Sequence, residues 1–241
     1  MLNNEKFDIQ DKEYVFPYHY LIDLKNYNNF KYLSWGLEYY SYMSFTVNYI
    51  SQLNFSDLLD VGCGDGRLIN ELSQNFPERN FYGVDMSQSA IFLAKGLNYH
   101  YKNTSFVCQD FSQIQNQFDI VVLNEVLEHI PDDIYQQFCK NIITKMKKGG
   151  VLVITVPTKN YPLISKHFRH YNIGMIKNDF SDLSLEEIKY IFSYSSFSKY
   201  ILAILSRIPY IKFIERLINK FFLQRSSEKK AKHLFVTLIK N

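Results

Sequence analysis

An apolar run that ends in three closely spaced glycines is the sequence feature that most constrains the fold. Residues 57–61 are rich in Leu and Val, and Gly62, Gly64 and Gly66 follow at alternate positions. Apolar residues then recur at helical spacing as far as Phe76. A buried strand that passes through a glycine-rich turn into a helix is typical of the ligand site of an open α/β sheet. Glycine suits this turn because the backbone bends sharply and approaches a ligand without a Cβ in the way.

An acid beside this loop indicates the kind of ligand. Dinucleotide-binding loops read G-x-G-x-x-G and seat a pyrophosphate on a helix N-terminus. Here the spacing is G-x-G-x-G, and Asp60 stands two residues before the first glycine. A carboxylate in that position would repel a pyrophosphate and attract a cationic amino group.

Residues 60–66 resemble the first motif of the class I S-adenosylmethionine (SAM) methyltransferases. In that family the loop wraps the methionyl part of a sulfonium cofactor that carries no phosphate. The resemblance implies that the cofactor is bound here by Asp60, Gly62, Cys63, Gly64 and Gly66.

Acids also end the next two expected strands. Residues 80–85 read as the second strand, and Asp85 lies about 20 residues past the loop, where such folds place a carboxylate on the ribose hydroxyls. An Asp that only caps the next helix is the alternative for this position. By the resemblance, Met86 would lie against the adenine, Asp110 would accept a hydrogen bond from its amino group, and Phe111 would lie beside the ring.

The apolar run at 118–124 predicts a central fourth strand, with Asn124 and Glu125 at its carboxyl end, below the methyl group to be transferred. The next helix should end in a lysine-rich turn before Gly149 and Gly150, and residues 151–157 should form the fifth strand. The sequences Glu-Val-Leu-Glu-His-Ile, and Lys-Gly-Gly before a Val-rich strand, are similar to those of the ubiquinone-type O-methyltransferases. This resemblance covers about residues 55–160.

The family resemblance implies an α/β fold: a Rossmann-like, seven-stranded, mostly parallel sheet flanked by helices. The last strand, at 233–240, should insert antiparallel between the fifth and the sixth. We expect an N-terminal aromatic extension over residues 1–50, including a helix at about 36–53, and a methyltransferase domain over 51–241. The extension would form a lid over the cofactor, or would only cover the edge of the sheet.

A divalent metal is an open alternative at the fourth strand. Glu125, Glu128 and His129 fall at i, i+3 and i+4, so that one helical turn would bring them onto a shared face. Some relatives with this pattern, including small-RNA 2′-O-methyltransferases, bind a metal through it, and His167 or His170 would be the further ligand. The favoured interpretation has no metal, with His129 or His170 as the catalytic general base.

The C-terminal part departs from the usual pattern. Ser184 and Glu187 fit a capping box that opens another helix. Residues 199–233 hold nine Lys or Arg against two Glu, with apolar residues interleaved. This composition predicts a C-terminal amphipathic helical insertion at about 199–232 and peripheral contact with an anionic membrane surface. A substrate lid, a dimer surface and a nucleic-acid contact are the alternatives.

Composition indicates the compartment. The three cysteines are far apart and lack metal-ligand spacing, which is typical of a reducing compartment. The N-terminus has no signal-peptide pattern, and no apolar run reaches the ~18 residues of a membrane span. We expect a cytoplasmic protein, with peripheral contact at the inner membrane face.

Taken together, these features predict a SAM-dependent methyltransferase. The favoured reaction is O-methylation of a small-molecule, glycan or lipid-linked acceptor, with nucleic acid a less favoured partner. The alternatives are an RNA 2′-O-methyltransferase with a divalent metal and a non-catalytic SAM-fold protein that activates a partner.

Overall fold

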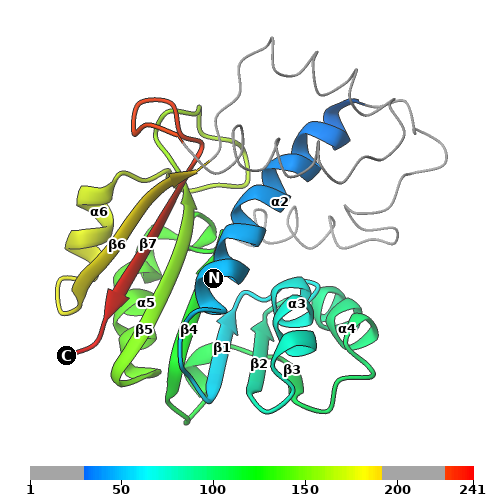
Figure 1. Ribbon diagram of the computed structural model, residues 1–241. Helices are drawn as coiled ribbons and strands as arrows, with labels where there is room; N and C mark the ends of the chain where they lie inside the picture. The colour runs from blue at the N-terminus through cyan, green and yellow to red at the C-terminus, as the bar shows by residue number, and fades with distance from the viewer. Residues whose placement is uncertain (1–29, 192–225) are drawn as a thin grey trace.

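The fold is built on one twisted β-sheet, as the computed structural model in Figure 1 shows. The structure describes residues 30–191 and 226–241. Over this part of the chain the sheet has seven strands in the order β3-β2-β1-β4-β5-β7-β6. They are β1 (Asp57–Val61), β2 (Asn80–Asp85), β3 (Thr104–Cys108), β4 (Phe118–Asn124), β5 (Met146–Pro157), β6 (Ser184–Ile191) and β7 (His233–Ile239). Strand β7 runs antiparallel to both β5 and β6, and the other pairings are parallel. The expected Rossmann-like sheet, with its last strand inserted antiparallel, is confirmed.

Helices cover both faces of the sheet (Figure 1). The helices are α2 (Phe30–Ile50), α3 (Arg67–Asn75), α4 (Gln88–Leu97), α5 (Asp132–Thr144) and α6 (Ile173–Asp179), with short 3-10 turns η1 (Phe111–Gln113) and η2 (Leu127–His129). Buried side chains of α2, α3 and α4 pack in one core cluster, and those of α5 and α6 pack in the other.

Strand β4 shows why the sequence forms a sheet that is buried on both faces. Ile120 and Val122 belong to the core under α2, α3 and α4, whereas Val121 and Leu123 belong to the core under α5 and α6. All four are at most 1% exposed. Successive side chains of a strand point to opposite faces, so a continuous apolar run fills both cores at once.

The order of the strands reverses at β1. The chain runs outward from β1 to β2 and β3, and then returns to pair β4 with the other edge of β1. Ligands of open α/β sheets bind at such a reversal, at the carboxyl ends of the strands. The turns that follow β1, β2 and β4 therefore meet where a ligand is expected.

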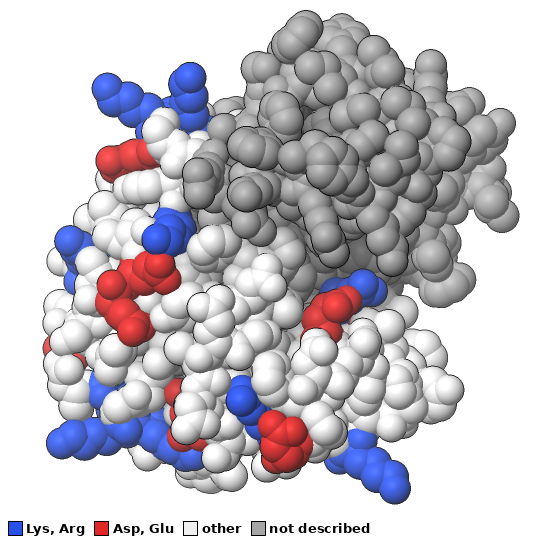
Figure 2. Space-filling model, in the orientation of Figure 1, with Lys and Arg blue, Asp and Glu red and all other residues white. Residues whose placement is uncertain are grey.

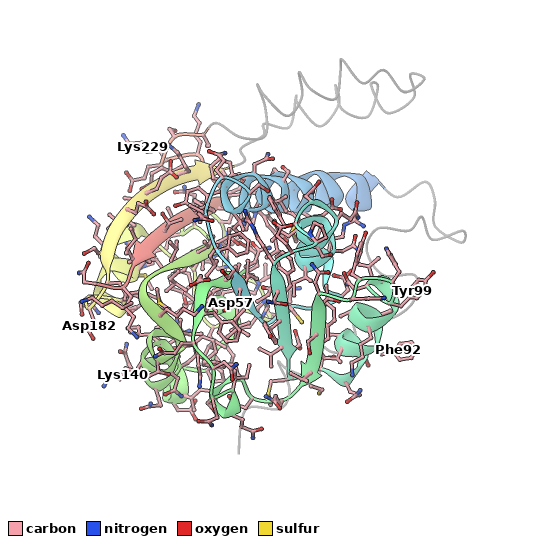
Figure 3. All side chains as sticks on the ribbon, turned by 60° about the horizontal axis from the view of Figure 1, so that its bottom comes forward. Asp57, Phe92, Tyr99, Lys140, Asp182 and Lys229 are labelled. Carbon is pink, nitrogen blue, oxygen red and sulfur yellow. The ribbon has the colours of Figure 1, made fainter. Side chains whose placement is uncertain are left out.

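The lysine-rich turn belongs to a strand, which corrects the expected end of the preceding helix. Helix α5 ends at Thr144, and β5 begins at Met146 by pairing with Phe118. Lys147 Nζ lies 2.8 Å from Asp57 Oδ2 and 3.0 Å from Asp119 Oδ1. These ion pairs join β5, β1 and β4 at their amino ends, and Figure 3 labels Asp57 among them.

The capping box at Ser184 is also wrong as a helix signal, because residues Ser184–Ile191 form strand β6. Their backbone pairs along β7, from Ser184 opposite Ile239 to Ile191 opposite His233. The Glu186 carboxylate accepts a hydrogen bond from the Tyr49 hydroxyl of α2, at 2.9 Å. Long-range pairing with β7 has outweighed a local helix preference.

Helix α2 is the described part of the expected N-terminal extension, and it begins and ends earlier than the predicted 36–53. Its Phe45 and Tyr49 rings contact the Phe235 ring of β7, with centroids 4.8 and 5.2 Å apart. Residues 1–29 of the predicted lid and residues 199–225 of the predicted basic insertion lie outside the described residues.

Within the described ranges, none of the helices combines the length and the apolar composition needed to cross a bilayer. On the face drawn in Figure 2, the described surface carries acidic and basic side chains close together.

Candidate active site

The turn after β1 is held against the tips of two neighbouring strands. The backbone N–H groups of Gly62 and Cys63 both donate to the Val84 carbonyl of β2, at N···O distances of 2.8 and 3.1 Å. Gly62 has a φ of +72°, and a Cβ there would lie 2.7 Å from Cγ2 of Val126, just past β4. Gly66 also has a positive φ and directly precedes α3. The glycines are therefore required by both backbone conformation and space.

Asp60, the last but one residue of β1, is 2% exposed. Its Oδ1 has no hydrogen-bond partner in the described part of the chain. Burial, followed by the negative charges of Asp85 and Asp65, raises the pKa of Asp60 well above its ordinary value. A buried carboxylate among other acids gains most from a cationic partner. The orphaned oxygen fits a ligand ammonium group and disfavours a phosphate.

Asp85 ties the glycine loop to the start of α4. Its Oδ2 accepts a hydrogen bond from the Gly64 N–H at 3.0 Å, and its Oδ1 accepts one from the Ser87 N–H at 2.8 Å. Each oxygen of this half-buried carboxylate can accept a further hydrogen bond, so the group could also bind the two hydroxyls of a vicinal diol. The helix itself is capped by the Ser87 side chain, not by Asp85. Met86 is 54% exposed beside it, where a planar ring could pack.

Asp110 and Phe111, the two residues expected at the adenine, lie in different environments just after β3. Asp110 is exposed, and its Oδ1 accepts a hydrogen bond from the Ser112 N–H at 2.8 Å. Phe111 is buried, and its ring packs edge-on against Phe138, with centroids 4.8 Å apart. Core packing thus accounts for Phe111 without a ligand, whereas Asp110 faces solvent at the ligand edge.

The tip of β4 is strained. Glu125 has a φ of +58° and is the one residue other than glycine with positive φ in the described ranges. Its N–H donates to the backbone carbonyl of Thr155, at 3.0 Å, while Asn124 Oδ1 accepts a hydrogen bond from the Thr155 hydroxyl. Backbone strain of this kind persists where neighbouring contacts enforce it, and it concentrates at functional sites.

The strained turn aims Glu125 at a buried histidine. Glu125 Oε1 lies 3.0 Å from Nδ1 of His233, and Nε2 of that ring lies 2.9 Å from Oε1 of Glu38 on α2. We call this arrangement the His233 bridge. Burial lowers the pKa of His233, but Glu125 and Glu38 outweigh it and raise the pKa to about 10. At neutral pH the ring is therefore a cation that joins α2, β7 and the tip of β4.

Sequence reasoning missed Glu38 and His233. Each stands far from the recognised motifs, and no local pattern marks either residue. The sequence pointed to His233 only indirectly. A last strand that runs antiparallel beside β5 begins at the edge of the sheet at which β4 ends.

The expected shared face of Glu125, Glu128 and His129 is wrong. Only Leu127–His129 form a turn, and Glu125 turns away to the His233 bridge. Glu128 instead lies with His129 and His167, and ligand atoms of these three lie within 4.8 Å of one another. Burial, and then the charge of Glu125, raise the pKa of Glu128 well above its ordinary value.

The two histidines predicted as general bases differ in their surroundings. His129 is partly exposed, and its Nδ1 lies 3.2 Å from the Lys166 carbonyl. His170 is buried, and its two ring nitrogens contact the Tyr161 carbonyl at 3.1 Å and Nδ1 of His167 at 2.8 Å. Because contacts within the chain engage both nitrogens of His170, it is better placed to orient His167 than to take a proton from a substrate.

Comparison with known proteins agrees with this geometry. Residues 56–199 match a family model described as a methyltransferase domain. The chain is 35% identical over 122 residues to a ubiquinone biosynthesis O-methyltransferase of Coxiella burnetii, covering 48% of this chain and 50% of that protein. It is 28% identical over 131 residues to a trans-aconitate 2-methyltransferase of Deinococcus radiodurans, covering 54% and 47%. The chain thus spans about half the length of the curated relatives it matches.

Solved structures share the fold along most of the chain. Magnesium protoporphyrin IX methyltransferase of Synechocystis PCC 6803, solved with bound SAM, aligns with a TM-score of 0.65 and 14% identity, over 98% of this chain and 97% of that one. The N-methyltransferase NodS of Bradyrhizobium japonicum WM9, solved with S-adenosyl-L-homocysteine, gives 0.63 and 14%, over 98% of both chains. At such identities the likeness concerns the fold alone.

Proposed function

The chain belongs to the class I SAM-dependent methyltransferases, and from this premise we propose that it methylates an oxygen atom of a small-molecule, glycan or lipid-linked acceptor. The observation that carries the proposal is the buried Asp60 carboxylate, whose Oδ1 has no partner among the described residues, behind the glycine turn. That oxygen matches a cationic, phosphate-free cofactor.

The residues present fit the cofactor one by one. Asp60 would hold the amino group, since an ammonium offsets the burial of its charge. Asp85 would accept from the ribose hydroxyls, and its fixed hydrogen bonds to Gly64 and Ser87 hold it in place for them. The exposed Met86 and Asp110 would contact the adenine.

The bound cofactor supplies a methyl group already activated by the positive sulfonium. The chain therefore has to orient the acceptor more than it has to activate the methyl. Asn124 and Glu125 lie at the carboxyl end of β4, beside the glycine turn, where that orientation would be set. The His233 bridge holds Glu125 in place, and in this proposal Glu125 would line the acceptor site.

The choice of oxygen rests on the curated relatives. Two of the matched proteins are O-methyltransferases by name, the ubiquinone biosynthesis enzyme and a malonyl-[acyl-carrier protein] O-methyltransferase of Bacillus anthracis. The basic, apolar composition of residues 199–232 supports an acceptor near an anionic lipid surface. With these residues, the protein would act at the cytoplasmic face of a membrane.

A labelling experiment tests the proposal. A lysate from cells that lack the protein is incubated with methyl-labelled SAM and the purified full chain, and is then separated into lipid, small-molecule, RNA and protein fractions. An Asp85→Ala variant, incubated in parallel, gives the background. We expect label above that background in the lipid or small-molecule fraction, in a product whose methyl is bound to oxygen.

Two results would overturn the proposal. Label confined to RNA would support the RNA 2′-O-methyltransferase alternative. SAM binding without label above background in any fraction would support a non-catalytic SAM-fold protein.

A further inference from the structure

We propose that the open edge of β3 pairs antiparallel with the same edge of a second copy of this chain, so that two seven-stranded sheets join into one. In the described part of the chain, β3 stands at the end of the sheet and pairs only with β2. Its other side therefore offers backbone N–H and C=O groups to which another strand can bond. This inference does not depend on which acceptor is methylated.

The two edges of the sheet differ in how they are protected. Strand β6 carries Glu186, Glu187 and Lys189, and its register with β7 shifts between Leu185 and Glu187. Charged side chains and irregular register are two ways in which proteins keep edge strands from pairing. Strand β3 reads Thr-Ser-Phe-Val-Cys, with no charge and no proline, and it pairs with β2 in unbroken register. Of the two edges, β3 is therefore the one that another strand can join.

The backbone hydrogen bonds of β3 identify the groups that face its open side. The Asn103 carbonyl accepts from the Phe81 N–H at 2.9 Å, and the Gln109 N–H donates to the Asp85 carbonyl at 3.2 Å. The N–H and C=O of one strand residue point to the same side, and that side alternates along the strand. The odd-numbered residues of β3 therefore bond to β2. The even-numbered residues direct their backbone groups to the open side: Thr104, Phe106 and Cys108.

An antiparallel pair centred on Phe106 would satisfy these groups. Phe106 would then lie opposite Phe106 of the second copy, and Thr104 would lie opposite Cys108. The two members of each pair can exchange N–H···O bonds, because the backbone groups of both face the shared edge. A two-fold axis through Phe106, perpendicular to the sheet, would relate the copies, so that each makes the same contacts as the other.

The same register brings opposite charges together. Lys102 precedes Phe106 by four positions, and Asp110 follows it by four. Both of these charged residues are exposed. With Phe106 at the centre, Lys102 of each copy comes beside Asp110 of the other. Such charge complementarity favours a second copy of the chain over a partner of uniform charge.

Two exposed rings lie on the same side of the molecule. Phe92 of α4 is 75% exposed, and Tyr99, just after α4, is 85% exposed. Asn70 of α3 donates to the Leu97 carbonyl at 3.3 Å, so α3 packs on the inner side of α4. Figure 3 shows Phe92 and Tyr99 at the margin of the molecule, on the side of β3. The open strand and the two rings thus belong to one surface.

Pairing of the strands would bring the two copies of α4 into contact. Helix α4 packs on β2 and β3, and its Ala94 borders Gly66 together with Phe106, so the middle of α4 lies near the proposed axis. Strands lie ~4.8 Å apart, so helices over the outer two strands of each copy would be about 10 Å apart, which is a packing distance for helices. Since the helices would run antiparallel, Phe92 of each copy would meet Tyr99 of the other, and buried aromatic contacts stabilise interfaces strongly.

Sedimentation velocity on the full chain tests the interface. We expect a dimer that dissociates on dilution. Phe92→Ser and Tyr99→Ser should each weaken dimerisation by about tenfold or more. Leu163→Ser is the matched control, because it removes an exposed apolar side chain from another part of the chain, the segment after β5. The control should dimerise as the wild type does.

A charge exchange tests the register. Lys102→Glu and Asp110→Lys should each weaken self-association by about tenfold, because each variant places like charges beside each other. A mixture of the two variants should form a dimer of one copy of each, since both charge pairs are then of opposite sign. A role of either residue within its own chain does not predict recovery on mixing. Failure of the mixture to associate would overturn the proposal.

Engineered cysteines test the same register by a covalent bond. Ser105 would lie opposite Val107 of the second copy in a non-hydrogen-bonded pair, with Cα atoms about 4.5 Å apart, which a disulfide can span. On a Cys108→Ser background, the double variant Ser105→Cys/Val107→Cys should form a covalent dimer on mild oxidation. Either single variant should stay unlinked, and a double variant that stays unlinked as well would contradict the register.

Two further results would overturn the proposal. A wild-type chain that is monomeric at every concentration would leave the edge to another partner. A dimer that Phe92→Ser and Tyr99→Ser leave unchanged would place the interface elsewhere. If these variants do not fold, amide hydrogen exchange of the wild type decides, because the Phe106 N–H should exchange more slowly at high than at low protein concentration, and unchanged exchange would overturn the proposal.

Discussion

Nδ1 of His233 lies 3.0 Å from Oε1 of Glu125, although 108 residues separate the two along the chain. The same ring reaches Glu38 of α2 through Nε2, at 2.9 Å. One buried imidazolium thus holds the strained tip of β4, the start of β7 and helix α2 together. The arrangement makes the positive φ of Glu125 intelligible, because that conformation aims its carboxylate at the ring.

Replacing the cation should be strongly destabilising. His233→Leu leaves Glu125 and Glu38 as partly buried carboxylates without their shared partner. Breaking a buried ion pair in this way lowers the free energy of unfolding by about 3 kcal/mol. Urea unfolding measures the change, and His100→Leu, at an exposed histidine, should stay within about 0.5 kcal/mol of the wild type. Equal midpoints for wild type and His233→Leu would contradict the bridge.

The bridge also predicts a pH dependence. The pKa of His233 is raised to about 10 in the folded protein, against about 6.5 in the unfolded chain. The folded state therefore holds the proton more tightly, so the contribution is fully present below pH ~6.5 and is lost as the pH rises through about 10. The stability difference between wild type and His233→Leu should shrink over that window. A difference that stays constant from pH 6 to pH 10 would contradict this assignment.

Asp85→Ala should weaken SAM binding by about tenfold or more, because the ribose hydroxyls would lose the carboxylate proposed to accept their hydrogen bonds. Asp85 also holds Gly64 and Ser87, so circular dichroism must show that the variant is folded. The control is Asp182→Ala, which removes an exposed acid at the far side of the sheet (Figure 3). Calorimetric titration with unchanged affinity in a folded Asp85→Ala would refute the ribose assignment.

Asp60→Asn should separate stability from binding. Burial raises the pKa of Asp60, so its ionised form disfavours folding increasingly as the pH rises above about 3.9. A neutral amide of the same shape should raise the thermal midpoint at pH 7, yet weaken SAM binding by about tenfold or more, since the ammonium loses its counter-charge. A variant that is less stable and binds SAM normally would contradict both expectations.

Gly62→Ala tests the turn itself. The substitution forces a side chain onto a φ of +72° and places a Cβ 2.7 Å from Val126. We expect a loss of about 2 kcal/mol or more in the free energy of unfolding. Gly96→Ala is the matched control, because this glycine lies in α4 and an added Cβ would have only the local backbone and its chain neighbours within 4 Å. That control should raise stability slightly, by about 0.5–1 kcal/mol.

The sequence predicted the parts of the site that depend on local order. Residues 57–66 hold their strand, turn and acid within one short segment, and Asp85 follows at a spacing that the fold imposes. Continuous apolar runs predicted the buried strands for the same reason, since the run at 118–124 can be recognised without knowledge of its neighbours.

Long-range pairing decided what the sequence left out. Ser184 and Glu187 satisfy a helix capping pattern, but a strand forms there because β7 supplies its hydrogen-bond partners. The local sequence places Lys147 at the end of a helix, whereas its ion pairs with Asp57 and Asp119 form only in the folded sheet. His233 lies far in sequence from Glu125 and Glu38, so only the folded topology brings it to them.

The place of β7 inside the sheet sets an order of events during synthesis. Val151 of β5 pairs with Ile239, and β6 reaches the sheet only through β7. Until residues 233–239 have left the ribosome, the edge of β5 in the nascent chain is unpaired, and β6 has no strand to pair with. We therefore expect that edge to be where chaperones bind the growing polypeptide, and where a prematurely stopped chain aggregates.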